Sequence, residues 1–333
     1  MLTHLTNAPF DKGRRHFCAA AFMAGAMPAH AWASVIDTNS SLTVSRVIDC
    51  DWMDRSRSRA VPARLYWPAT AASGSVPLVV FSHGIGGSRR GYAYLGQHLA
   101  SQGWACLHVQ HVGSDDIVWN GNPFSVVGRL QTAAQSAEAL HRTYDLRFAL
   151  DRVLKEEEPL PIDTRRIVVA GHSYGANTAM LSVGARVELD GKVLELHDDR
   201  YAAALLLSAP PFYRESDIAR ILQPITVPSL HITTTEDAIH IPGFQSPPSD
   251  RIGIYNAMGG EPKQLIVYNG GSHSVFTDRG RICGRSQQIK TSTKLLIHAY
   301  LRQVFDSDAS QMTQWSERWI GQLARASGPF IST

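Results

Sequence analysis

The clearest chemical signal in the chain is the pattern Gly-x-Ser-x-Gly at 171–175, which reads Gly-His-Ser-Tyr-Gly. A run rich in β-branched residues precedes it at 166–170, and an Ala-, Met- and Leu-containing segment follows at 177–182. A strand that turns into a helix within five residues must fold back tightly, which small glycines permit. Such a turn, a nucleophile elbow, would lift Ser173 above the sheet at a helix N-terminus, where backbone N–H groups stabilise an oxyanion. We therefore predict that Ser173 is a nucleophile.

An imidazole and a carboxylate would have to activate that serine, because its hydroxyl must lose a proton as it attacks an ester. In the α/β-hydrolase fold these groups follow in the order Ser, acid, His, each on a loop after a strand. Asp237 comes soon after a predicted strand at 228–234. His273 likewise follows a predicted strand at 263–268, so we predict that the two are the acid and the base. Glu236 is the rival acid, and we favour Asp237 because aspartate is usual at this turn.

A glycine-rich loop at 82–87, Ser-His-Gly-Ile-Gly-Gly, directly follows a predicted apolar strand at 76–81. Glycines let the backbone approach a substrate carbonyl, and the N–H of Ile85 would point at its oxygen. Together with the N–H of Tyr174, beside the serine, it would form an oxyanion hole. The alternative is a phosphate-binding loop, but the segment lacks both G-x-G-x-x-G and G-K-[ST].

The other histidines are expected to have structural roles, since no two of them have a zinc-ligand spacing. His172 lies inside the elbow and should point into the structure, while His83 should brace the glycine-rich loop. His231 and His298 fall within a predicted strand and a predicted helix. His240, near the predicted acid, stays open as a residue of the pocket rim. We predict no metal and no cofactor.

The segment 113–128 has no strong period and lies beyond a predicted strand, at the edge where open α/β sheets bind ligands. Its aromatic residues Trp119 and Phe124 are therefore candidate substrate-binding residues. The alternative is a loop folded onto the core, and both interpretations stay open.

The expected pocket is open, because the segment 211–227 between two predicted strands is too short for a large lid. Its acyl side would be bounded by the bulky residues Ile85, Tyr174 and Trp119, which leave little depth beside Ser173. We therefore expect acetyl and butyryl esters to be turned over faster than long-chain esters.

Eight predicted strands, alternating in their later part with amphipathic helices, indicate an α/β fold with a mostly parallel eight-stranded sheet and helices on both faces. An antiparallel hairpin should open the sheet, and a last amphipathic helix is expected across 312–323. The predicted strands are 42–52, 61–67, 76–81, 104–109, 166–170, 201–208, 228–234 and 263–268.

The composition suits one large core. The chain has 333 residues, of which 44% are apolar and 18% charged, and no Pro-, Gly- or Ser-rich linker divides it. We therefore expect a single α/β-hydrolase domain at 34–333. The net charge is +3 and no basic stripe interleaved with aromatic residues occurs, so no nucleic-acid partner is expected.

Residues 1–33 resemble a secretory signal of the twin-arginine type. Arg14 and Arg15 precede an uncharged, Ala-rich stretch at 17–29, and small-x-small cleavage sites follow at 29–33. The stretch is shorter than the roughly 20 residues that cross a bilayer, so no stable membrane insertion is expected. We expect export to the periplasm or the extracellular space, and the general secretory route stays open.

Several short segments of the chain match one known family. They are Trp52-Met53-Asp54, residues 81–87, Gly113-Ser114-Asp115, Asp145-Leu146-Arg147-Phe148, the elbow, and Gly271-Ser272-His273. With them the chain resembles the platelet-activating-factor acetylhydrolase and predicted dienelactone hydrolase branch of the α/β-hydrolases, which is related to bacterial polyester hydrolases.

The resemblance implies a serine esterase. The family's nucleophile, acid and base fall on Ser173, Asp237 and His273, and its oxyanion donors fall on Ile85 and Tyr174. Dienelactone hydrolases proper carry cysteine in place of the serine. The insertion 187–200 departs from compact members and would reshape one side of the pocket.

The expected function is a secreted serine hydrolase that cleaves a small or lipid-like ester through an acyl-enzyme. An acyltransferase or amidase could use the same three residues, since the sequence does not show which acceptor resolves the intermediate. A non-catalytic binding protein with this fold is disfavoured, because such proteins usually lose a triad residue or an oxyanion glycine.

Overall fold

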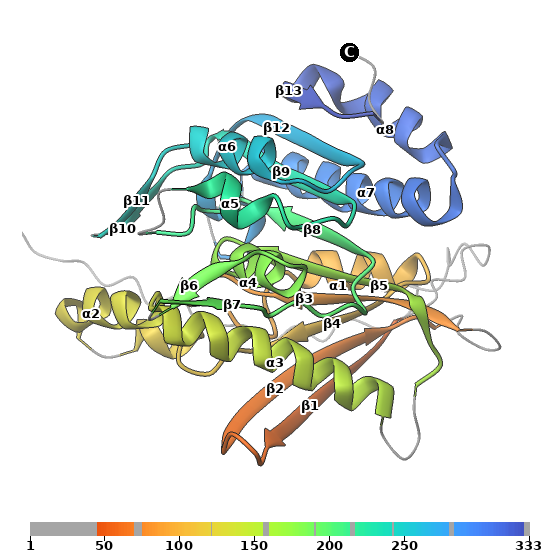
Figure 1. Ribbon diagram of the computed structural model, residues 1–333. Helices are drawn as coiled ribbons and strands as arrows, with labels where there is room; N and C mark the ends of the chain where they lie inside the picture. Colours follow the sequence, from red (N-terminus) through yellow and green to blue (C-terminus); the bar gives the residue numbers. More distant parts are fainter. Residues whose placement is uncertain are drawn as a thin grey trace, which may run out of the picture. The chain divides into compact units, whose positions relative to one another are not determined.

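Nine strands form one mixed, mostly parallel sheet in the part of the chain that the computed structural model describes (Figure 1). That part comprises residues 45–69, 75–120, 122–155, 160–189, 191–213, 217–241, 243–279 and 283–329. The strands are β1 (Arg46–Asp54), β2 (Arg59–Trp67), β3 (Val76–Ser82), β4 (Ala105–Val109), β5 (Ile162–His172), β8 (Ala203–Leu207), β9 (Ser229–Glu236), β12 (Lys263–Ser272) and β13 (Leu323–Ser327). The proposed signal segment 1–33 lies outside the described residues.

The strand order is β1-β2-β4-β3-β5-β8-β9-β12-β13. Neighbours from β4 through β12 pair in parallel, whereas β1–β2, β2–β4 and β12–β13 pair antiparallel. The opening antiparallel hairpin is therefore as expected. The central strands can read as continuous apolar runs because both of their faces are buried.

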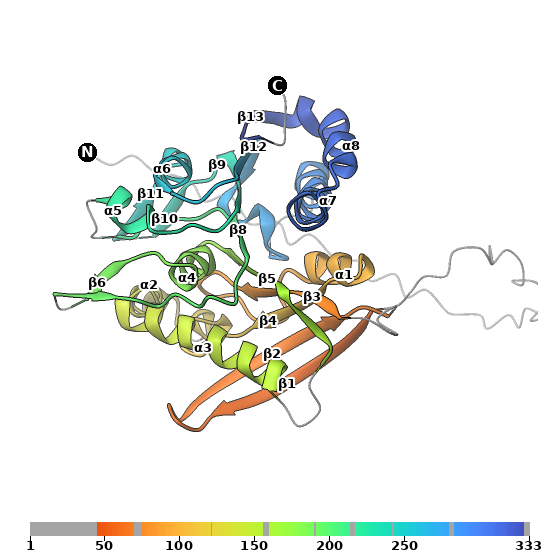
Figure 2. The ribbon, with the colours of Figure 1, turned by 45° about the vertical axis from the view of Figure 1, so that its right-hand side comes forward.

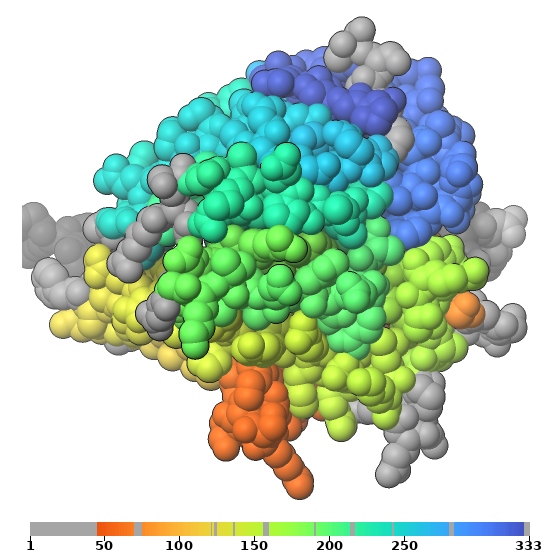
Figure 3. All heavy atoms as spheres, in the orientation of Figure 1, coloured from red at the N-terminus to blue at the C-terminus, as the bar shows by residue number. Residues whose placement is uncertain are grey.

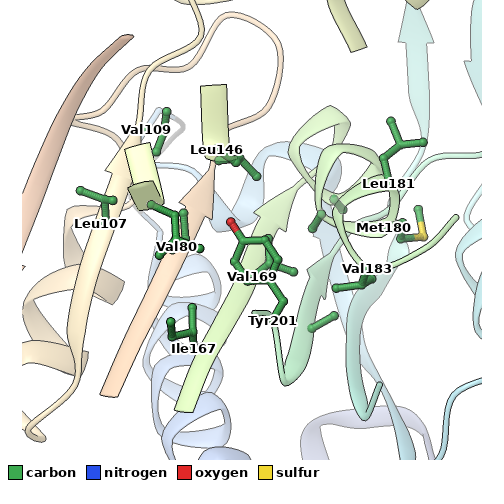
Figure 4. Close-up of a cluster of buried hydrophobic side chains, with 14 of the residues drawn as sticks. Val80, Leu107, Val109, Leu146, Ile167, Val169, Met180, Leu181, Val183 and Tyr201 are labelled. Carbon is green, nitrogen blue, oxygen red and sulfur yellow. The ribbon is translucent and has the colours of Figure 1, made fainter. Parts of the chain in front are cut away.

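Each face of the sheet has its own core. Along β3, Leu78 and Val80 belong to one cluster of buried side chains, whereas Val79 and Phe81 belong to the other. This alternation follows from the two-residue period of a strand. Figure 4 shows part of the first cluster, in which Val80 lies beside Leu146, and Met180 and Leu181 of α4 lie on the far side of Val169.

Helices cover both faces, as predicted (Figure 2). The first cluster includes residues of α3 (Ser136–Lys155), α4 (Tyr174–Ser182), α5 (Ile218–Leu222) and α6 (Ser249–Ala257). The second cluster includes residues of α1 (Ala93–Ser101), α7 (Gly284–Asp306) and α8 (Ser310–Trp319).

The structure corrects two expectations about the fold. The sheet has a ninth strand, β13, where the last helix was expected to continue; α8 ends at Trp319 and the strand begins at Leu323. The segment 113–128, expected to be irregular, contains the short 3-10 helix η1 (Asp116–Trp119) and the start of α2 (Pro123–Ala133).

Two small hairpins stand apart from the main sheet. The insertion 187–200 contains the first, formed by β6 (Val187–Leu189) and β7 (Lys192–Leu194). The second follows the predicted acid and consists of β10 (Ile239–Ile241) and β11 (Phe244–Ser246).

The predicted site lies at the carboxyl ends of the parallel strands. The glycine-rich loop follows β3, Ser173 follows β5, Asp237 follows β9, and His273 follows β12. Since parallel strands end at the same edge of the sheet, these four segments meet there.

Candidate active site

The turn at Ser173 is as tight as the sequence pattern requires. Ser173 itself has φ 55° and ψ −126°, a conformation that non-glycine residues seldom adopt. A Cβ on Gly171 would lie 2.1 Å from the carbonyl oxygen of Gly175, and one on Gly175 would lie 2.0 Å from that of Ser82. The two glycines are therefore needed because β3, β5 and α4 approach too closely for a side chain.

A line of hydrogen bonds joins the three residues predicted as nucleophile, base and acid. His273 Nε2 lies 2.8 Å from Ser173 Oγ, and His273 Nδ1 lies 2.6 Å from Asp237 Oδ1. The carboxylate of Asp237 is fully buried, and its Oδ2 accepts a 2.6 Å hydrogen bond from Thr233 Oγ1. The rival Glu236 has an exposed side chain at the end of β9.

Arg251, which the sequence analysis did not identify, contacts both Asp237 and His273. The Arg251 side chain, from α6, is 2% exposed, and its Nη2 lies 3.3 Å from Asp237 Oδ1 and 3.5 Å from His273 Nδ1. Its Nη1 donates to Ser246 Oγ and to the Pro247 carbonyl. No local motif marks Arg251, because its helix lies outside the strand-end loops that carry the catalytic groups of this fold.

The neighbours of Asp237 keep its carboxylate ionised. Burial by itself would raise the pKa of this carboxyl. The hydrogen bond and charge of His273 and the charge of Arg251 outweigh burial, so the pKa lies well below its usual range. Asp237 is therefore ionised at neutral pH and available to stabilise an imidazolium.

The residues that carry the two predicted oxyanion donors line the same cavity as Ser173. Within the described residues, the N–H groups of Ile85 and Tyr174 are bonded to no acceptor. The loop that carries Ile85 is fixed by the neighbouring amide of Gly86, which donates to the Ser114 carbonyl at 2.8 Å. The arrangement leaves both N–H groups able to bind a substrate oxygen.

A second buried arginine, Arg142, contacts both of the segments that carry the oxyanion donors. Arg142 is fully buried, donates to the His83 carbonyl and to Ser114 Oγ, and lies 4.9 Å from the centre of the Tyr174 ring. Burial lowers the pKa of Arg142 to about 10, so the guanidinium is still charged at neutral pH. It therefore links the glycine-rich loop to the start of α4.

The histidines beside the site take the structural positions expected from the sequence. His172 Nδ1 is bonded to the Tyr92 hydroxyl at 2.8 Å, and its Nε2 donates to the His273 carbonyl at 3.0 Å. Burial lowers the pKa of His172 to about 3. His83 Nδ1 donates to the Gly84 carbonyl at 2.7 Å, inside the loop that it was expected to brace. His240 lies exposed on β10.

Both aromatic candidates lie in the segment after β4. Trp119 lines the cavity at its mouth, 47% exposed, and its Nε1 donates to the Gly86 carbonyl at 2.9 Å. It is therefore attached to the glycine-rich loop rather than folded into the core. Phe124 lies on α2, but its side chain is outside the described part of the structure.

The cavity over Ser173 has a volume of about 730 Å³ and extends beyond the residues that were expected to close it. Ile85, Tyr174 and Trp119 do line it, but so does the insertion, through residues of β6 and β7. The expectation of little depth beside Ser173 is therefore wrong. The cavity is deeper than expected because the insertion forms an added wall, whose position the sequence alone could not predict.

Neither a metal-binding group of side chains nor a membrane-spanning helix is found among the described residues. They contain no group of three or more His, Cys, Asp or Glu side chains placed to hold a metal ion. Among the same residues, no helix has the length and apolar character needed to cross a membrane.

The strand topology and the turn at Ser173 define an α/β-hydrolase fold. The chain is similar to a ferulic acid esterase from Streptomyces cinnamoneus, with a TM-score of 0.56 at 20% identity over 79% of this chain and 90% of that one. It is also similar to a PEG-bound, cold-adapted esterase from an Arctic intertidal metagenomic library, with a TM-score of 0.50 at 20% identity over 77% of this chain and 93% of that one. At such identities the likeness shows the fold.

Within that class, the chain is similar to the family described as platelet-activating factor acetylhydrolase, isoform II, whose model matches residues 50–118. It is also 23% identical over 267 residues to the platelet-activating factor acetylhydrolase of Cavia porcellus. That match covers 69% of this chain and 55% of the relative, so the chain spans about half of the relative's length. The family resemblance expected from the sequence is confirmed, and the proteins concerned are ester hydrolases by name.

Proposed function

We propose that this chain is a carboxylic ester hydrolase that works through an acyl-enzyme on Ser173. The observation that carries the proposal is the hydrogen-bonded line from Asp237 through His273 to Ser173, at an elbow that opens into a cavity. The ester-hydrolase names of the similar proteins support the same reaction class.

In the first half of the proposed reaction, Ser173 Oγ attacks the ester carbonyl and His273 Nε2 accepts its proton. Asp237 stabilises the imidazolium through the bond to Nδ1. The N–H groups of Ile85 and Tyr174 bind the oxyanion. When the tetrahedral intermediate collapses, the imidazolium returns the proton to the departing alkoxide, which leaves as the alcohol.

In the second half, His273 removes a proton from water, which attacks the acyl-enzyme carbonyl. The C–Oγ bond then breaks, the imidazolium returns the proton to Ser173 Oγ, and the acid leaves. The proposed substrate is a small or lipid-like ester, in keeping with the acetylhydrolase name of the relative. The short-acyl preference expected from the sequence depended on a shallow pocket, and the extended cavity removes that support. Export of the chain by the signal at 1–33 remains part of the proposal on the basis of the sequence.

A fluorophosphonate probe tests the proposal directly, because it reacts with an activated serine and not with ordinary hydroxyls. The wild-type protein should be labelled and should release p-nitrophenol from p-nitrophenyl acetate. Ser173→Ala should abolish both signals, and Ser272→Ala, a nearby exposed serine, should retain both. Turnover or labelling that persists in Ser173→Ala would contradict the assignment, and a wild-type protein that hydrolyses no ester would support a binding function instead.

A further inference from the structure

We propose that the insertion 187–200 forms the outer wall of an apolar site that runs from Ser173 along α4 and holds the acyl chain of the substrate. This inference rests on the proposed function, since it concerns the same cavity. It names the substrate class as esters with an apolar acyl chain of medium length.

The length of the site follows from α4. Ser173, Asn177 and Leu181 all line the cavity, and their spacing of four residues places them on one face of the helix. At a rise of 1.5 Å per residue, Leu181 lies about 12 Å along the axis from Ser173. The cavity therefore has an arm, from Ser173 to Leu181, that reaches two helical turns beyond the nucleophile.

The walls of this arm are mostly apolar, although Glu188 on the hairpin also lines the cavity. Leu140 from α3 and Leu181 from α4 line it from the body of the protein, and Val187, Leu189 and Leu194 line it from the hairpin. Figure 3 shows the green segment that contains the insertion directly against the yellow segment of α2 and α3. Burying an alkyl chain between such walls removes it from water, at about 0.8 kcal/mol per methylene, which corresponds to about fourfold in kcat/KM.

Between Ser173 and Leu181, the one polar residue on this face of α4 is Asn177, whose Oδ1 has no hydrogen-bond partner among the described residues. Asn177 Nδ2 donates to the Pro210 carbonyl at 3.1 Å, so its donor is directed to the protein. One turn further along α4, the residue that lines the cavity is Leu181. The end of the arm is therefore lined by hydrocarbon.

The insertion is fixed to the body after the hairpin and is thus a wall of defined position. The amide of Asp198 donates to the Ser182 carbonyl at 2.9 Å, at the end of α4. Arg147 from α3 donates to the His197 carbonyl at 3.0 Å. A wall held to both helices can discriminate acyl chains by shape.

The proton path decides which half of the ester occupies the arm. His273 must protonate the departing oxygen, so the alcohol lies beside η2 (His273–Phe276), where Ser274 and Thr277 line the cavity. That segment packs against α7, on the face of the sheet opposite α4. The acyl chain therefore extends away from His273, along α4.

The test is a series of p-nitrophenyl esters from acetate through butyrate and octanoate to decanoate. In the wild-type protein, kcat/KM should rise by at least about tenfold from acetate to octanoate, because several methylenes enter the arm. Leu189→Trp, which fills the arm from the hairpin, should lower the decanoate-to-acetate ratio of kcat/KM by at least about tenfold. The matched control is Val193→Trp on the same hairpin, since Val193 is 51% exposed and does not line the cavity; it should leave the ratio unchanged.

Several outcomes would overturn the inference. One is a wild-type kcat/KM that falls steadily with acyl length, and another is an unchanged ratio in Leu189→Trp when far-UV circular dichroism shows it folded. If that variant does not fold, Val187→Trp fills the arm from the other end of the same strand, β6, and should give the same change. A ratio that responds to the length of the alcohol, in octyl against ethyl acetate, would assign the arm to the other half of the ester.

The failure of the inference can be told apart from failure of the proposed function. If Ser173→Ala abolishes acetate turnover while the chain-length series is flat, ester hydrolysis stands and the acyl site is wrong. If Ser173→Ala hydrolyses acetate as well as the wild type does, the proposed function itself is wrong.

Discussion

Arg251 lies 3.3 Å from the carboxylate of Asp237, on the same oxygen that accepts the hydrogen bond of His273. Its side chain is almost completely buried, so solvent screens this interaction little. Arg251 therefore shares the negative charge of Asp237 with the imidazole.

We predict that Arg251→Met lowers kcat for p-nitrophenyl acetate by roughly tenfold. The guanidinium helps to keep the buried Asp237 carboxylate ionised, and it contacts the same oxygen that accepts the hydrogen bond of His273. Arg251→Lys should restore kcat in part. An unchanged kcat in a folded Arg251→Met variant would show that Arg251 acts only in packing.

The acid assignment is tested by two amide substitutions. Asp237→Asn should lower kcat by several orders of magnitude, because an amide cannot stabilise the imidazolium and offers His273 the wrong hydrogen-bond partner. Glu236→Gln should leave kcat within about twofold of the wild-type value, since this side chain is exposed. Rates of p-nitrophenyl acetate hydrolysis decide between them, and a damaging Glu236→Gln would reverse the assignment.

The nucleophile and base should behave as one unit. Ser173→Ala and His273→Ala should each reduce kcat by roughly three to six orders of magnitude, and the double variant should cost little more. The reason is that neither group activates the ester without the other, given the 2.8 Å bond between them. Reductions that multiply in the double variant would indicate that the two residues act independently.

Much of this site could be predicted because its residues sit at strand ends in a fixed chain order. The elbow glycines, Ser173, Asp237 and His273 are all local signals of this kind, and the structure brings the three side chains together. Arg251 and Arg142 could not be found in the same way. Their positions depend on how α6 and α3 pack, which a single sequence does not reveal.

In the fold, too, some elements could be predicted from local sequence, whereas others depend on how the chain packs. The eight strands with strong apolar character were predicted, whereas β13 reads Leu-Ala-Arg-Ala-Ser and has little intrinsic strand propensity. It forms because it can pair with the free edge of β12. The depth of the cavity was also missed, since it depends on where the polar insertion 187–200 packs.

Export is predicted from the sequence alone. Replacing Arg14 and Arg15 by lysine should leave unprocessed precursor in the cytoplasm, because the twin-arginine receptor recognises the pair as an address. Cell fractionation and N-terminal sequencing would measure this, with the mature chain expected to begin near Trp32 or Ser34. Unchanged secretion of the double-lysine variant would indicate the general route instead.

The lowered pKa of Asp237 predicts a pH-dependent contribution to stability. Because the pKa in the folded protein lies below that of an unfolded chain, about 4, ionised Asp237 stabilises the fold fully above that value. The contribution is lost as the pH falls toward the lower folded pKa. Asp237→Asn lacks this titration, so the difference in free energy of unfolding between wild type and variant should shrink between pH 6 and pH 3. Urea unfolding at the two pH values measures it, with Glu236→Gln as the exposed control, and a difference that stays constant would mean that Asp237 is not held ionised by His273 and Arg251.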